Sequence, residues 1–345
     1  MRSLASVAFA LFAAVTCGCA SGGMPPVALA HNTTGAEHLA AGRLDEAEAR
    51  FRLALEYNGR FADAHANLGL VALERGHLAQ AERHLRDAIR INEDFAQAWG
   101  NLGVVLERRG HAADAEQAFE RALSIDPGLT SARRNLAFLH ARHGRFDRAR
   151  AQLMRLAELA ADDYEAQGLL AYCELRLGRP EAATARATYV LERDPGAAAA
   201  RVVRGVARAR RGDVDGAIND LEIAALDPSV GRDARTRLAA VRLVNGEVET
   251  ALTIASALVD EDGSDAAARL VLASAELAAG HAERAERQAR EALRLSPRLD
   301  HARVLIASAC ESRGDLACAR TAVNGVEGTG VAAAQAARLR AALDR

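Results

Sequence analysis

The chain contains no lysine, so every strongly basic side chain is an arginine. This absence excludes catalysis through a lysine Schiff base and phosphate binding by a P-loop lysine. Aromatic residues make up only 4% of the chain although 50% of it is apolar, and alanine and leucine supply most of the remainder. Such a composition favours helices that pack through small side chains over a sheet with a large aromatic core.

The chain also lacks an excess of charge of either sign. Its formal net charge is −2, which is not the basic balance expected of a nucleic-acid-binding protein. Its length of 345 residues would ordinarily suggest two domains.

The N-terminus has the pattern of a secretory signal. Arg2 precedes a short apolar run at residues 4–15, which is too short to span a bilayer. Residues 1–18 are therefore predicted to be a signal peptide, and the mature protein is expected in the bacterial cell envelope.

Two cleavage modes compete after this signal. Residues 16–21 (TCGCAS) resemble the lipobox of bacterial lipoproteins, although the threonine three residues before Cys19 departs from the usual leucine. The resemblance implies acylation of Cys19, a tether over residues 19–27 and, because Ala20 follows the cysteine, an outer-membrane lipoprotein facing the periplasm. Alternatively, the sequence Ala-Leu-Ala at 28–30 suits signal peptidase I, and the protein would be soluble in the periplasm or secreted with no role for Cys19.

A period of 34 residues runs through the rest of the chain. Glycine recurs at 42, 76, 110, 144, 178, 212, 246, 280 and 314, and alanine stands five residues after each of them. The segment before each glycine has apolar residues at helical spacing, and a second helical segment follows. We expect the glycine to end the first helix in a left-handed conformation and the alanine to let the second helix cross it closely.

This pattern resembles the tetratricopeptide repeat (TPR). Consensus positions are matched in the third repeat by Trp99, Leu102, Gly103, Leu106, Ala115, Phe119, Ala122 and Pro127. The resemblance covers about residues 28–330, and 331–345 has the pattern of a polar-faced capping helix. It implies an all-α, right-handed superhelical solenoid of about nine helix pairs plus the C-terminal capping helix, as one quasi-linear domain rather than the two that the length suggests.

The sequence has no nucleophile elbow, no paired-cysteine zinc spacing and no H-E-x-x-H motif. His140 and His143 share a helical face, but no third metal ligand is nearby in sequence, so helix capping is favoured over a metal site. The acidic pairs at 162–163 and 260–262 fall where turns are expected. We therefore predict no enzyme activity, no cofactor, no metal and no small-molecule substrate.

The remaining cysteines suit an exported protein. Cys173 stands alone in a first helix and is expected to be a buried, small apolar residue. Cys310 and Cys318 flank the last repeat glycine on two antiparallel helices, so a disulfide is one alternative and two free thiols the other.

Two series of polar residues are candidates for recognition, since first helices in the TPR family line a concave groove that binds extended or helical peptides. Asparagines 34 residues apart could bond a peptide backbone, and arginines at the ends of first helices could bind an acidic segment or a C-terminus. The alternatives are consensus asparagines and cations that stabilise helix C-termini. The predicted groove residues are Asn67, Asn101, Arg108, Arg134, Asn135, Phe138, Arg142, Tyr172, Arg176 and Arg210.

The functional prediction is a non-catalytic scaffold for protein–protein interaction, held at the membrane by its lipid anchor. Its architecture resembles that of lipoproteins which assist pilus and secretin assembly. An accessory of an envelope enzyme for peptidoglycan or polysaccharide synthesis or export is the alternative.

Overall fold

A computed structural model describes residues 24–328 and 330–343. These residues form 19 helices and no β-strand. The predicted signal peptide, Cys19 and the first part of the tether lie outside them. No helix among the described residues is both long enough and apolar enough to cross a membrane.

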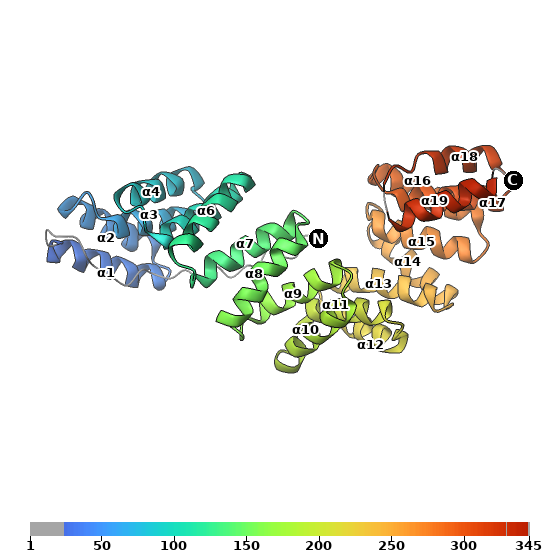
Figure 1. The fold of residues 1–345 in the computed structure, drawn as a ribbon, viewed down its shortest axis with the longest axis horizontal. Coiled ribbons are helices and arrows are strands. Elements are labelled where there is room, and N and C mark those ends of the chain that lie inside the picture. Colours follow the sequence, from blue (N-terminus) through green and yellow to red (C-terminus); the bar gives the residue numbers. More distant parts are fainter. Residues whose placement is uncertain (1–23, 329, 344–345) are drawn as a thin grey trace. The chain divides into compact units, whose positions relative to one another are not determined.

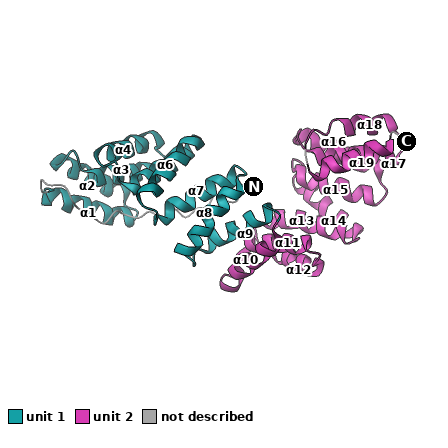
Figure 2. Ribbon diagram, in the orientation of Figure 1, with its two compact units in different colours: residues 1–178 teal, residues 179–345 magenta. Residues whose placement is uncertain are grey.

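The chain divides into two units at Gly178, and each is described by itself (Figure 2). Helices of residues 1–178 are α1 (Pro26–Ala40), α2 (Leu44–Tyr57), α3 (Ala62–Glu74), α4 (Leu78–Ile91), α5 (Ala96–Arg108), α6 (Ala112–Ile125), α7 (Thr130–Arg142), α8 (Phe146–Leu159) and α9 (Tyr164–Arg176). The first of them begins two residues inside the predicted tether.

Residues 179–345 contain the other ten helices (Figure 1). They are α10 (Pro180–Arg193), α11 (Ala198–Arg210), α12 (Val214–Ala225), α13 (Gly231–Val244), α14 (Val248–Glu261), α15 (Ala266–Ala278), α16 (Ala282–Leu295), α17 (Asp300–Ser312), α18 (Leu316–Asn324) and α19 (Val331–Leu343). Odd-numbered helices from α1 to α17 are the first helices of the nine predicted pairs, and even-numbered helices are the second.

The repeat glycine ends each first helix as predicted. All nine have φ between 71° and 86°, which a residue with a Cβ adopts only at a steric cost. In the third pair the Gly110 N–H donates to the Glu107 carbonyl and the His111 N–H donates to the Leu106 carbonyl, both at 2.9 Å. These two bonds form a Schellman motif, so the turn satisfies carbonyls that the helix end leaves open.

The alanine five residues later lies at the crossing of the two helices. All nine of these alanines have no exposed surface. Opposite them, a Cβ built on Gly69 would lie 3.4 Å from the Ala81 carbonyl, and one on Gly205 would lie 3.3 Å from the Ala217 carbonyl. The backbones are therefore as close as the small residues allow, which confirms the packing role predicted for them.

Turns between successive pairs are built by an asparagine or aspartate. The Asp126 carboxylate accepts from the Gly128 N–H at 2.9 Å, and Asp262 accepts from the Ser264 N–H at the same distance. Asp163 accepts from the Ala166 N–H at the start of α9. These contacts bear out the interpretation of the acidic pairs as turn and capping residues.

First helices form one continuous face in each unit. Within residues 24–178 the first helices α1, α3, α5, α7 and α9 contact one another in succession, as do α11, α13, α15 and α17 in the second unit. At the C-terminus α19 packs on both α17 and α18 and buries Ala332, Ala336 and Leu343. It covers the apolar end of the last pair, as a capping helix does.

Candidate functional site

The three asparagines of the series differ in burial and in hydrogen bonding. Asn67 is only 1% exposed, and its Nδ2 donates to Asn32 Oδ1 at 3.1 Å. The prediction that Asn67 contacts a ligand is therefore wrong, because the polar first helix α1 places a buried amide opposite it. Asn101 and Asn135 are half-buried, and neither side chain makes a hydrogen bond within residues 24–328.

Two arginines of the series tie consecutive first helices together at their C-terminal ends. Arg108 Nη1 lies 3.5 Å from the Leu73 carbonyl oxygen, one repeat earlier, and Arg142 forms an ion pair with Glu107. The contact of Arg108 with a carbonyl at the end of a helix agrees with the alternative that these arginines stabilise helix C-termini. The Arg142 side chain nevertheless remains 62% exposed, so it can also contact a ligand.

Burial changes the acidity of the partner of Arg142. It raises the pKa of the Glu107 carboxyl, an effect that the nearby Arg142 and His143 charges reduce without reversing. The Glu107 carboxylate is therefore partly desolvated, whereas the Arg142 side of the ion pair stays open to solvent.

Arg176 lies against aromatic rings. Its Nη1 donates to Tyr172 Oη at 2.6 Å, and its Cζ lies 4.4 Å from the centroid of the Phe146 ring. Tyr172 and Phe138 are half-buried and pack on the core of this unit. Arg210 is exposed on α11 in the second unit.

Arg134 has a structural role. Its Nε and Nη2 lie 2.8 and 2.7 Å from Asp163 Oδ2, and its side chain is only 21% exposed. Because Asp163 also caps α9, this pair links α7 to the start of α9. Arg134 thus has a partner within the chain, and its contact with a ligand stays a prediction.

A second series of ion pairs was missed from the sequence. A glutamate six residues after the repeat glycine pairs with an arginine next to the following glycine, and side chains of these glutamates are at most 15% exposed. The pairs are Glu48–Arg75, Glu82–Arg109, Glu116–Arg145 and Glu286–Arg313. Their spacing of 27 to 29 residues in the sequence could have revealed them.

In four repeats the residue eleven positions before the glycine makes a common contact. Trp99 Nε1 donates to the Glu93 carbonyl at 2.9 Å, and Arg133 Nη2 donates to the Pro127 carbonyl at 2.6 Å. Arg201 and Arg269 make the same bond to the carbonyl six residues earlier. Arginine at this position therefore supplies the same N–H contact to the turn before the helix that Trp99 supplies in the third repeat.

The histidine within α7 and the histidine that follows it have different surroundings. His143 Nδ1 lies 2.9 Å from the Leu139 carbonyl oxygen, which is the expected capping contact. His140 is 3% exposed, and its Nδ1 lies 4.0 Å from Glu116 Oε1. Among the described residues neither belongs to a group of three metal-ligating side chains.

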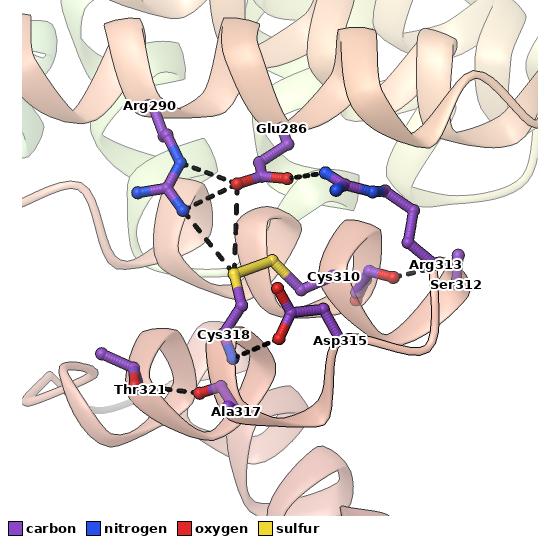
Figure 3. The surroundings of a disulfide bond; sticks show 10 residues. Glu286, Arg290, Cys310, Ser312, Arg313, Asp315, Ala317, Cys318 and Thr321 are labelled. Carbon is purple, nitrogen blue, oxygen red and sulfur yellow. Dashed lines mark hydrogen bonds and ion pairs between the residues drawn. A yellow bond between two sulfur atoms is a disulfide. The ribbon is translucent and has the colours of Figure 1, made fainter.

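The cysteines of the last pair form a disulfide. Cys310 and Cys318 have Cα atoms 5.8 Å apart, and the bridge lies beside the Glu286 carboxylate and Arg290 (Figure 3). Cys173 is buried, and its burial raises the pKa of its thiol to about 12. At that pKa it is not a reactive thiolate.

The second unit has a cavity of about 360 Å³ between α15, α17 and α19. Its polar lining is provided by Ser274, His301, Ser308, Gln335 and Arg338. Within this unit the cavity lies on the first-helix face, and no repeat spacing in the sequence indicates it.

Comparison with known proteins agrees with the repeat pattern. One family model described as tetratricopeptide repeat matches residues 33–91, 67–130, 175–231 and 236–298. A second model of the same description matches residues 106–173. No curated protein matches the chain.

Three solved structures share the fold. A tetratricopeptide repeat protein from Parabacteroides merdae is 18% identical, covers 72% of this chain and 98% of its own length, and superposes with a TM-score of 0.60. PilF of Pseudomonas aeruginosa (19% identical, 59% of this chain, 92% of its own) has a TM-score of 0.53. PilW, a type IV pilus biogenesis factor (19%, 59% and 97%), has a TM-score of 0.52.

Proposed function

Because the chain belongs to the tetratricopeptide repeat family, we propose that it is a non-catalytic scaffold that binds partner proteins through its first-helix face. Asn101 and Asn135 carry this proposal. Their amides stand one repeat apart on α5 and α7, and their hydrogen-bonding capacity is not used within the described residues. An amide both donates and accepts, so such a pair suits the backbone of an extended peptide.

The charge of the partner follows from Arg142. Its guanidinium lies at the C-terminal end of α7, next to the same face, and is 62% exposed although it is paired with Glu107. A carboxylate could share this guanidinium in bidentate fashion. We therefore expect a peptide with an acidic segment or a free C-terminus, bound over repeats two to five.

The proposed location is the bacterial envelope, with acylated Cys19 as the anchor. The signal-like N-terminus and the lipobox resemblance support it. Pilus or secretin assembly is the proposed setting, and the fold that the chain shares with PilW, a type IV pilus biogenesis factor, supports it. An enzyme accessory would use the same face on a different partner.

Crosslinked co-purification from intact envelopes tests the proposal. The variants are Asn101→Ala with Asn135→Ala, Arg142→Glu, and the charge swap Glu107→Arg with Arg142→Glu. The swap restores an ion pair between α5 and α7 but reverses the sign of the charge at position 142. We expect all three to lose partner capture, with the swap retaining wild-type thermal stability.

Wild-type capture by both the charge swap and the asparagine variant would contradict the proposal. The partner identified by mass spectrometry then separates pilus or secretin components from synthesis or export enzymes. The anchor is tested separately with Cys19→Ser, which should move the protein from the membrane to the soluble fraction.

A further inference from the structure

One pair of positions joins the two helices of a repeat through polar side chains. The first position lies eleven residues before the repeat glycine, and the second lies eight residues after it. In α7 and α8, Arg133 Nη1 donates to Gln152 Oε1 at 3.0 Å. In α15 and α16, Arg269 makes the equivalent bond to Gln288 at 2.6 Å. A donor and an acceptor are thus matched across these helix pairs.

In the second repeat the same two positions are both histidine. The His65 and His84 ring centroids lie 5.9 Å apart, and no hydrogen bond joins the two rings. Nδ1 of each ring is buried and has no hydrogen-bond partner among the described residues. Buried polar atoms are rarely left without a hydrogen-bond partner, so a pair of rings that are not matched as donor and acceptor calls for another explanation.

A carboxylate completes the group. Asp87 follows His84 by three residues on α4 and so lies on the same side of that helix. One ligand atom from each of His65, His84 and Asp87 lies within 4.8 Å of the others. Among the described residues the other such group contains Cys310 and Cys318, which are joined in the disulfide.

We propose that His65, His84 and Asp87 bind a divalent first-row transition-metal ion, with Zn²⁺ as the expected occupant. Two imidazoles and a carboxylate are ligands that this ion accepts, and a tetrahedral centre would have one position left for water or a partner. The site joins α3 to α4 at the place where other repeats use a hydrogen bond. This inference goes beyond the proposed scaffold function and does not depend on it.

The surroundings of His65 fit a metal ligand. Its Nε2 lies 3.4 Å from the Gly59 carbonyl oxygen, so the N–H is placed on that nitrogen and Nδ1 carries the lone pair. Histidine ligands commonly donate their other N–H to a backbone carbonyl in this way. Asp87 is also paired with Arg90 on the exposed side of α4, which leaves its second oxygen for the metal.

Burial also favours the metal-binding form of His84. Desolvation lowers the pKa of this imidazole, and the charges of His65, Arg83 and Arg52 lower it further against the opposing effect of Asp87. The buried site therefore favours the neutral ring, which is the form that coordinates a metal. The same arginines repel a cation, so we expect a reversible site rather than one that retains its metal through purification.

Isothermal titration calorimetry tests the site, with ZnCl₂ added to the purified, chelator-treated full chain. The variants are His84→Gln and Asp87→Asn, with His111→Gln as a matched control because His111 is an exposed histidine of the next repeat. Glutamine already occupies the equivalent position in α8 and α16, so His84→Gln should fold, and circular dichroism checks this. We expect one ion per chain, at least tenfold weaker binding in His84→Gln and Asp87→Asn, and unchanged binding in the control.

Cobalt(II) provides the second measurement. The proposed site should give d–d absorption without thiolate-to-cobalt charge transfer, and His84→Gln should lose these bands. The proposal is overturned if the wild-type chain binds neither ion. It is equally overturned if folded His84→Gln binds as tightly as wild type, or if charge-transfer bands place the metal on cysteines.

Discussion

The Arg204 guanidinium forms a bidentate ion pair with the buried carboxylate of Asp220, with Nη2–Oδ1 and Nε–Oδ2 distances of 2.7 and 2.8 Å. Arg208 Nη1 lies 2.9 Å from the same carboxylate, which has no exposed surface. Arg204 occupies the position at which α5 and α7 carry the core residues Leu102 and Leu136. The sixth repeat has therefore exchanged an apolar contact between α11 and α12 for a buried ionic one.

Removing the carboxylate alone should lower the free energy of unfolding more than removing the carboxylate together with its bidentate arginine. We expect Asp220→Ala to destabilise the second unit by about 3 kcal/mol, because two arginines lose a buried partner. Adding Arg204→Leu should recover most of this loss, since leucine is the residue found at this position in other repeats and Arg208 retains Asp213. Hydrogen exchange of α11 and α12 measures both effects locally. Equal exchange in the single and double variants would contradict the prediction.

The buried His140 should make the stability of the first unit depend on pH. Burial lowers the pKa of this imidazole, and the charges of Arg145 and Arg148 add to the effect while Glu116 opposes it. The unfolded chain, with an ordinary histidine pKa, therefore binds more protons below about pH 6.5, so stability is present above that pH and is lost as the pH falls. His140→Leu should reduce this loss, because the equivalent residue of α5 is the buried Leu106.

Urea unfolding at about pH 7 and about pH 5 checks this prediction. The wild-type midpoint for the first unit should fall more between the two values than the midpoint of His140→Leu. A parallel decrease in both proteins would show that other groups account for the acid sensitivity. His111→Leu is the control, since His111 is an exposed histidine of the same unit.

Substitution by alanine should change the stability of the chain in opposite directions at two helix glycines. A Cβ on Gly103 would lie 2.6 Å from Phe119 Cε1, and Phe119 has no exposed surface into which it can move. Gly103→Ala should therefore destabilise the chain by about 1–3 kcal/mol. No atom lies within 4 Å of a Cβ on Gly168 in α9, so Gly168→Ala should stabilise it by about 0.5–1 kcal/mol. Thermal unfolding of the two variants beside wild type is sufficient, and a shift of the same sign in both would refute the argument.

The repeat spacing predicted the fold because the packing residues are local and periodic. Gly110 and Ala115 act within one helix pair, and their 34-residue register carries the same geometry along the chain. The family and the all-α fold are accordingly confirmed. The junction after the sixth repeat is irregular, since α12 has 12 residues where its counterparts α4 and α6 have 14.

The candidate site was less predictable because its residues depend on neighbours in other repeats. Asn67 fits the same spacing as Asn101, but its burial comes from Asn32 on a first helix that departs from the consensus. The partners of Arg134 and Arg142 lie 29 and 35 residues away, and spacing alone does not distinguish a bound ligand from these carboxylates. The His65–His84 pair emerges only when the two positions are compared between repeats with side chains in place.

The disulfide of the last pair should stabilise the C-terminal end of the second unit. Cys310 and Cys318 enclose a short loop around Gly314, and loop-closure entropy for a ring of this length corresponds to about 2.5 kcal/mol. Non-reducing peptide mapping should find the two cysteines joined, and reduction should increase hydrogen exchange in α18 and α19. The variant Cys310→Ala with Cys318→Ala should already exchange faster and should not respond to the reductant. Two free thiols in the oxidised protein would contradict the bridge, whereas an identical response of wild type and variant would show that reduction acts elsewhere. Because α19 covers α17 and α18, the bridge would protect the cap that shields the apolar end of the solenoid.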